Sequence, residues 1–144
     1  MKTKKINVAL LKRVMRHIRQ DKRRLVMRAY CEPDEWLEFR GHPCGTVACI
    51  AGWALILDRA KGSTHKEIQA ARDHFISLTP AGLSRSDVLF KRAMKLLGLN
   101  TGQAKRLFVF RNWPSTLRIK PEDEDNVSQA IRRIKHFIET NGAE

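Results

Sequence analysis

A histidine and two cysteines stand close together as His42-x-Cys44-x4-Cys49, and side chains of these types bind zinc or, as thiolates, attack substrates. A tetrahedral zinc site would be completed by one of four further residues: Cys31, His65, His74 or His136. The spacing is not that of a paired ligand motif such as C-x2-C, and a cysteine in an apolar run packs as a small hydrophobic residue. We predict no metal and no other cofactor, although zinc binding and simple packing both stay open for these three residues.

A catalytic thiol is the second reading of the same residues. Cys44 comes shortly before a predicted helix, whose N-terminal end lowers the pKa of a nearby thiol, and His42 is a general base close in sequence. Residues on either side of Pro43 seldom face each other, however, and no third group to orient the histidine is identifiable. We therefore predict no catalytic residue, and a cysteine-dependent enzyme using Cys44 and His42 stays an alternative.

Positive charge is the strongest functional signal in the chain, because the net charge of +13 is concentrated in two segments. Residues 1–28 hold eleven Lys and Arg against one acid, Asp21, for a net charge of +10. Residues 59–120 hold thirteen against three, again for +10, whereas residues 29–58 and 121–144 are net acidic, at −4 and −3. The charge therefore favours a surface that meets an anionic partner.

The first helix is predicted to run from Asn7, as N-cap, to about Gln20, with one apolar stripe and a cationic arc of about 120° beside it. Clustered Lys and Arg favour phosphate backbones because binding releases counterions. The candidate nucleic-acid-binding residues come from the N-terminal arm, this arc and the second basic segment: Lys4, Lys5, Lys12, Arg13, Arg16, Arg19, Arg23, Arg92, Lys95, Lys105, Arg106 and Arg111.

An all-α fold is predicted, with about six helices in a single compact domain over residues 1–144 and a basic N-terminal arm at 1–6. Every position of residues 46–57 is apolar or small, which is typical of a helix buried on all sides, with Thr46 as its N-cap. The remaining helices should begin at capping or first-turn signals, and two of them should end at glycines. These signals are Thr64 with Glu67, Ser84 with Asp87 and then Gly98, Asn100 with Gln103 for a helix to about Phe110, and Pro121 with a stop at Asn141-Gly142. We expect no sheet.

Two short helices joined at Gly98-Leu99 have the arrangement of a helix-turn-helix. A recognition helix reads bases with side chains at its N-terminal end, and here Thr101-Gly102-Gln103 offers little besides Gln103. Trp113, next to Pro114, is expected to fill core or mark a hinge rather than to stack on a base. Sequence-specific reading of DNA is therefore not our main prediction.

Two blocks resemble a group of small proteins from bacteria and their phages: Cys44-Gly-Thr-Val-Ala-Cys-Ile-Ala-Gly-Trp-Ala54, and Leu96-Leu-Gly-Leu99 through Leu107-Phe108 to Trp113-Pro114. The resemblance covers Ile6 to about Ile138 and implies no activity. A phage setting would suit interference with a host nucleoprotein machine. The first block is also similar to the Cys-Gly-Ser-Cys-Trp run of papain-type thiol proteases, but Val47 stands at the position of the nucleophile.

The longest uncharged apolar run, Val47 to Leu57, is too short to span a bilayer, which takes about 20 residues. The basic N-terminus is followed by an amphipathic pattern and not by a secretory signal, so we predict a cytoplasmic protein with reduced thiols and no membrane partner. The function predicted is a non-enzymatic module that binds nucleic acid or a nucleoprotein complex. The competing prediction is an inhibitor or binder of an acidic protein, and the oligomeric state is not indicated.

Overall fold

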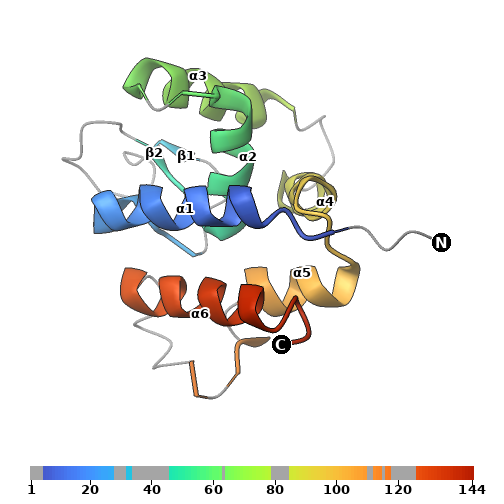
Figure 1. Ribbon diagram of the computed structural model, residues 1–144. Coiled ribbons are helices and arrows are strands. Elements are labelled where there is room, and N and C mark those ends of the chain that lie inside the picture. Colours follow the sequence, from blue (N-terminus) through green and yellow to red (C-terminus); the bar gives the residue numbers. More distant parts are fainter. Residues whose placement is uncertain are drawn as a thin grey trace.

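The computed structural model describes residues 5–27, 32–33, 46–62, 64–78, 85–109, 112–114, 116–117 and 126–144. Six α-helices make up most of this part of the chain, as predicted: α1 (Val8–Gln20), α2 (Ile50–Ala60), α3 (His65–Ser77), α4 (Arg85–Leu96), α5 (Thr101–Phe108) and α6 (Val127–Glu139). A short 3-10 turn, η1 (Lys22–Arg24), follows α1. In Figure 1, α1 crosses the middle of the molecule with α3 above it and α6 below it, and α2 runs steeply behind it.

The predicted first helix is confirmed at both ends. Asn7 is its N-cap, and the Asn7 side chain accepts a hydrogen bond of 3.1 Å from the Leu10 amide. One side of α1 is buried against α2 and α6, and it carries Leu10, Leu11, Val14, Met15, His17 and Ile18. The residues that point away from this side are the charged ones, so the 3.6-residue period of the sequence sets which face of α1 meets solvent.

The apolar central helix is also confirmed, but it begins later than predicted. All residues of α2 from Ile50 to Leu57 are buried, and α2 packs against α1, α3, α4 and α5. Its N-cap is Cys49 and not Thr46, since the Cys49 sulfur accepts from the Gly52 amide at 3.5 Å. The predicted bounds 46–57 are therefore wrong at both ends.

A short strand pair occupies the place where the central helix was predicted to start. Strand β2 (Thr46–Val47) pairs antiparallel with β1 (Glu32–Pro33), and Ala48 forms a bridge with Leu25. The expectation of no sheet misses this pair, because a period of two cannot be recognised over two residues. The pairing holds Thr46 in an extended backbone and so moves the helix start to Cys49.

The predicted caps of the next helices are confirmed where the structure describes them. The Thr64 hydroxyl accepts from the Glu67 amide at the start of α3, and Asn100 and Gln103 form a capping box at the start of α5. The predicted cap Ser84 lies outside the described residues, and α5 ends at Phe108 rather than Phe110.

Gly98 adopts a positive φ of 70° where the chain turns from α4 to α5. A Cβ there would also collide with the Lys5 carbonyl oxygen, because the Asn7 amide donates to the Leu97 carbonyl at 2.9 Å and draws the start of α1 onto this turn.

The last helix has a side-chain cap at its start. α6 begins at Val127, with Asn126 as an N-cap that accepts from the Gln129 amide, and the predicted start at Pro121 lies outside the described residues. The predicted stop is confirmed, since Asn141 and Gly142 both have positive φ. Asn126 is a stronger start signal than Pro121 because its side chain satisfies a free amide of the first turn. Within the described residues, none of the helices combines the length and the apolar character that crossing a bilayer requires.

Candidate functional site: two cationic surfaces

Three of the predicted binding residues form an exposed cationic arc on α1, namely Lys12, Arg16 and Arg19. They are spaced by four and three residues, so they lie on one face of the helix, opposite its buried side. α1 contains no Asp or Glu, and no carboxylate of the described residues pairs with these three side chains. We call these residues the α1 arc. It presents three solvated positive charges with little to neutralise them.

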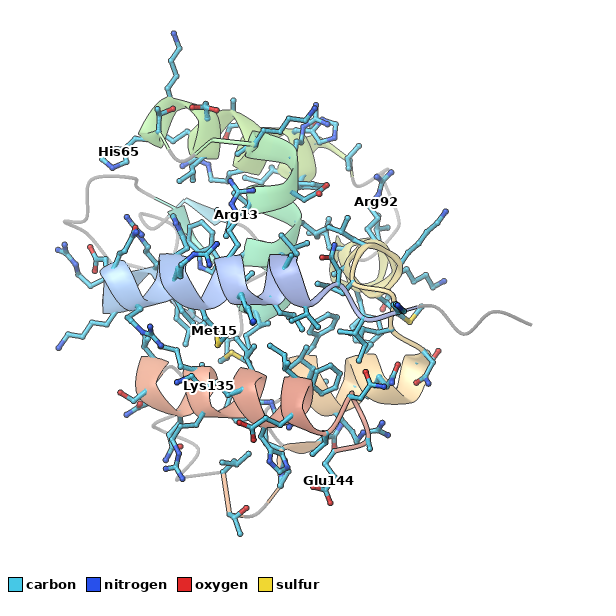
Figure 2. The ribbon with its side chains drawn as sticks, in the orientation of Figure 1. Arg13, Met15, His65, Arg92, Lys135 and Glu144 are labelled. Atoms are coloured by element: carbon cyan, nitrogen blue, oxygen red, sulfur yellow. The ribbon has the colours of Figure 1, made fainter. Side chains whose placement is uncertain are left out.

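Arg13 belongs to the predicted set but has a structural role. Its guanidinium donates to the Leu57 carbonyl at 2.6 Å and to the Gly62 carbonyl at 3.2 Å, both at the C-terminal end of α2. Figure 2 shows Arg13 reaching from α1 towards α2. A cation placed on the last carbonyls of a helix satisfies free acceptors and the negative end of the dipole. Arg13 therefore joins two helices and is not available to a ligand.

We predict that Arg13→Met lowers the free energy of unfolding by about 2 kcal/mol, because two charge-assisted hydrogen bonds to carbonyls are lost. The matched variant Arg16→Met should change stability by less than about 0.5 kcal/mol, since Arg16 is exposed. Urea denaturation followed by circular dichroism checks both. Equal losses of stability in the two variants would contradict the conclusion that Arg13 has a structural role and Arg16 has none.

Two more predicted residues are held by other groups. Helix α1 ends at Gln20, so Arg23 lies in η1, where its amide and guanidinium donate to the Asp21 carboxylate at 2.8–3.0 Å. Arg106 is half-buried and donates to the Gly142 carbonyl at 2.7 Å, which ties α5 to the chain after α6. A ligand would have to compete with these bonds, and the role of both residues as ligand contacts stays a prediction.

The second cationic surface is a groove where α2 ends against α3 and α4. Its volume is about 940 Å³, and its lining consists of five Lys and Arg, one His, one Asp and three apolar residues: Arg59, Lys61, Lys91, Arg92, Lys95, His74, Asp58, Leu55, Phe75 and Leu96. Of the predicted residues, only Arg92 and Lys95 fall here. Arg92 points outward from α4 on the α3 side (Figure 2). We call this region the α2–α4 groove.

The pKa of His74 reflects the positive charge of the α2–α4 groove. Burial lowers the pKa of His74 below its ordinary value, and the nearby positive charges of Arg59 and Arg92 lower it further. The His74 ring lies edge-on to Phe75, with 5.2 Å between the centroids. The groove therefore disfavours any additional positive charge and favours an anion.

The remaining predicted binding residues are scattered. Lys5 and Lys105 are exposed, at the start of the described chain and on α5, whereas Lys4 and Arg111 lie outside the described residues. The candidate binding residues did not include Arg59, Lys61 and Lys91, and His74 was considered only as a zinc ligand, because only the packing of α2 against α3 and α4 brings these residues together. The spacing of Lys91, Arg92 and Lys95 on one helix was the one available signal.

A buried arginine also escaped prediction. Arg133 on α6 is fully buried and donates to the Arg106 carbonyl at 3.2 Å, and its Nε and Nη1 have no hydrogen-bond partner among the described residues. Burial, and then the charge of Arg106, lowers the pKa of Arg133 to about 10, while Glu144 acts in the opposite direction. The Cζ atom of Arg133 lies 5.5 Å from the Phe137 ring centroid, and this cation–π contact offsets part of the cost of burying the charge. The side chain stays charged at neutral pH and closes the end of α5.

The positions of Gln103 and Trp113 do not support a helix-turn-helix that reads bases. The Gln103 side chain accepts from the Asn100 amide at 3.0 Å and is therefore engaged in the capping box. Trp113 is buried, as expected, and its indole N–H donates to the Leu107 carbonyl at 3.0 Å. Neither side chain is placed to read a base.

The cysteine and zinc hypotheses depend largely on residues outside the described part, since Cys31, His42 and Cys44 all lie there. Cys49 is buried at the start of α2. Within the described ranges, no three His, Cys, Asp or Glu residues are grouped in a way that could hold a metal ion.

The chain was also compared with known proteins. No family model, no curated protein and no solved structure matches it.

Proposed function

We propose that the protein is a binding module for nucleic acid, and that it contacts the phosphate backbone mainly through the α1 arc. The observation that carries the proposal is the combination of Lys12, Arg16 and Arg19 on one exposed face with no acid on the same helix. Like charges held this close repel one another, and a polyanion relieves that repulsion while releasing its own counterions.

The dimensions of the α1 arc agree with those of a phosphate backbone. From Lys12 to Arg19 the arc rises by seven residue steps, or about 10 Å at 1.5 Å per residue. One strand of a duplex carries one charge per about 3.4 Å of its axis, so about three phosphates of one strand fall within this length. Three cations can therefore each find a phosphate without bending the nucleic acid. Because Gln103 is engaged elsewhere, we expect binding that is largely independent of base sequence.

The test is the salt dependence of binding to a fluorescein-labelled DNA duplex, measured by anisotropy. Three phosphate contacts predict a slope of roughly −2.7 in log affinity against log salt, so affinity should fall roughly 40-fold between 50 and 200 mM NaCl. Two duplexes of different sequence should bind within about threefold of each other. No binding at 50 mM, or an affinity that salt does not change, would refute the proposal. A protein partner that resists nuclease treatment in a pull-down would then favour the acidic-protein alternative.

A further inference from the structure

We infer that the α2–α4 groove is a second binding site, and that it takes a compact anion with two or more linked phosphates. The site is distinct from the α1 arc, and its ligand need not be a nucleic acid strand. Among the residues that the structure describes, five Lys and Arg side chains line the groove against one carboxylate, that of Asp58. One phosphate group cannot neutralise that excess, whereas a diphosphate or triphosphate carries enough charge and enough acceptor oxygens.

The groove is a built feature rather than a chance cluster of surface lysines. Its volume of about 940 Å³ lies within the range of small-ligand pockets, about 300–1,000 Å³. Arg59 and Lys61 come from the end of α2, and Arg92 and Lys95 from α4, which packs directly on α2. The cations therefore belong to two helices whose relative position is fixed by the core.

The groove is lined by apolar as well as charged side chains. Leu55 and Phe75 are buried, with 4% and 5% of their surface exposed, whereas Leu96 is partly exposed and adds apolar area to the lining. The negative end of the α2 dipole repels an anion only weakly here, because Arg13 already binds the Leu57 and Gly62 carbonyls. The exposed cations of the lining come from the end of α2 and from α4, and two of them, Arg59 and Arg92, lie close enough to His74 to lower its pKa.

His74 provides the direct readout. A bound anion would offset the charges of Arg59 and Arg92, which now lower the pKa of His74. In an NMR titration of the full chain with ¹³C-labelled histidine, inorganic pyrophosphate should raise the pKa of His74 by about 0.5 to 1 unit. His65 and His136 lie outside the groove and serve as internal controls, with no comparable shift. Sodium sulfate at equal ionic strength should produce a smaller effect.

Two double variants locate the site. Arg92→Gln with Lys95→Gln should weaken pyrophosphate binding about tenfold or more, and both residues are exposed, so the fold should survive. Lys12→Gln with Arg16→Gln removes the same charge from the α1 arc and should change pyrophosphate affinity by less than about twofold. If pyrophosphate leaves the pKa of His74 unchanged, or if both double variants weaken binding equally, the inference is wrong.

Linked phosphates have two sources, a free nucleotide-like molecule and the phosphorylated end of a strand. An oligonucleotide with a 5′-triphosphate should bind more tightly than the same strand with a 5′-hydroxyl if the groove holds strand ends, and the groove variant should abolish that difference. If the groove holds a free ligand, a nucleoside triphosphate should shift His74 while the end group makes no difference. Either result supports the site. Binding of the duplex by the α1 arc is measured in the separate anisotropy assay, so each proposal can fail while the other is still tested.

Discussion

Replacing Arg16 and Arg19 by glutamate should lower the affinity of the protein for duplex DNA at least roughly 50-fold at 0.1 M salt. Each lost phosphate contact removes about 0.9 log units of counterion release at this salt concentration, and two contacts give about 60-fold. The new carboxylates add repulsion from the backbone. Both positions are exposed on α1, so the effect should appear in binding and not in stability. Fluorescence anisotropy with the labelled duplex measures it, and circular dichroism confirms the fold.

The matched control applies the same change of charge elsewhere. Lys66→Glu with Arg132→Glu alters exposed residues on α3 and α6, outside the α1 arc and the groove. This variant should weaken binding by no more than about fivefold, because only the general attraction is reduced. The slope against log salt should become shallower by roughly 2 in the α1 variant and should hardly change in the control. Equal losses in the two variants would mean that net charge, rather than the α1 arc, drives binding.

Replacing Trp53 by alanine should have the largest effect on stability, a loss of about 3–5 kcal/mol in the free energy of unfolding. Trp53 is fully buried in the middle of α2, and the centroid of its ring lies 4.4 Å from the centroid of the His17 ring on α1. Its indole N–H donates to the Arg24 carbonyl at 2.9 Å. The truncation thus opens a cavity where α1, α2 and η1 meet and leaves a carbonyl short of a donor. Thermal unfolding should occur roughly 10 °C lower or more.

Trp53→Phe separates packing from hydrogen bonding. It keeps most of the ring volume but loses the indole N–H, so we expect a cost of about 1–2 kcal/mol. Urea denaturation of both variants gives the comparison. The phenylalanine variant should bind the duplex as the parent protein does, since Trp53 lies beneath the surface. A loss below about 1 kcal/mol in the alanine variant would show that the core at α1 and α2 is not organised around this residue.

Local signals predicted much of the fold. Asn7, Thr64 and Asn100 start helices because each side chain satisfies an amide within three residues, and Gly98 ends one because it tolerates a positive φ. The errors arose where a distant segment decided the outcome. The helix expected from Thr46 starts at Cys49 because β1, more than ten residues earlier, pairs with Thr46 and Val47.

The candidate site was predicted less well than the fold, for the same reason. Arg13 and Arg16 belong to one cationic arc in the sequence, yet only the structure shows that the end of α2 lies beside Arg13. Arg16 is exposed, whereas Arg13 is partly buried. The exposure of each residue depends on which helices pack against α1. The α2–α4 groove combines residues from three helices, so helical periodicity within any one of them could not reveal it.

The position of α1 between α2 and α6 also sets an order of events during synthesis. Among the described helices, α1 is translated before all the others and α6 after them, so the part of α1 that α6 covers stays uncovered while the helices between them are made. Contacts this distant in sequence close late and slowly. A nascent chain that stops before Val127 should therefore expose the apolar residues of α1 that α6 covers in the folded protein.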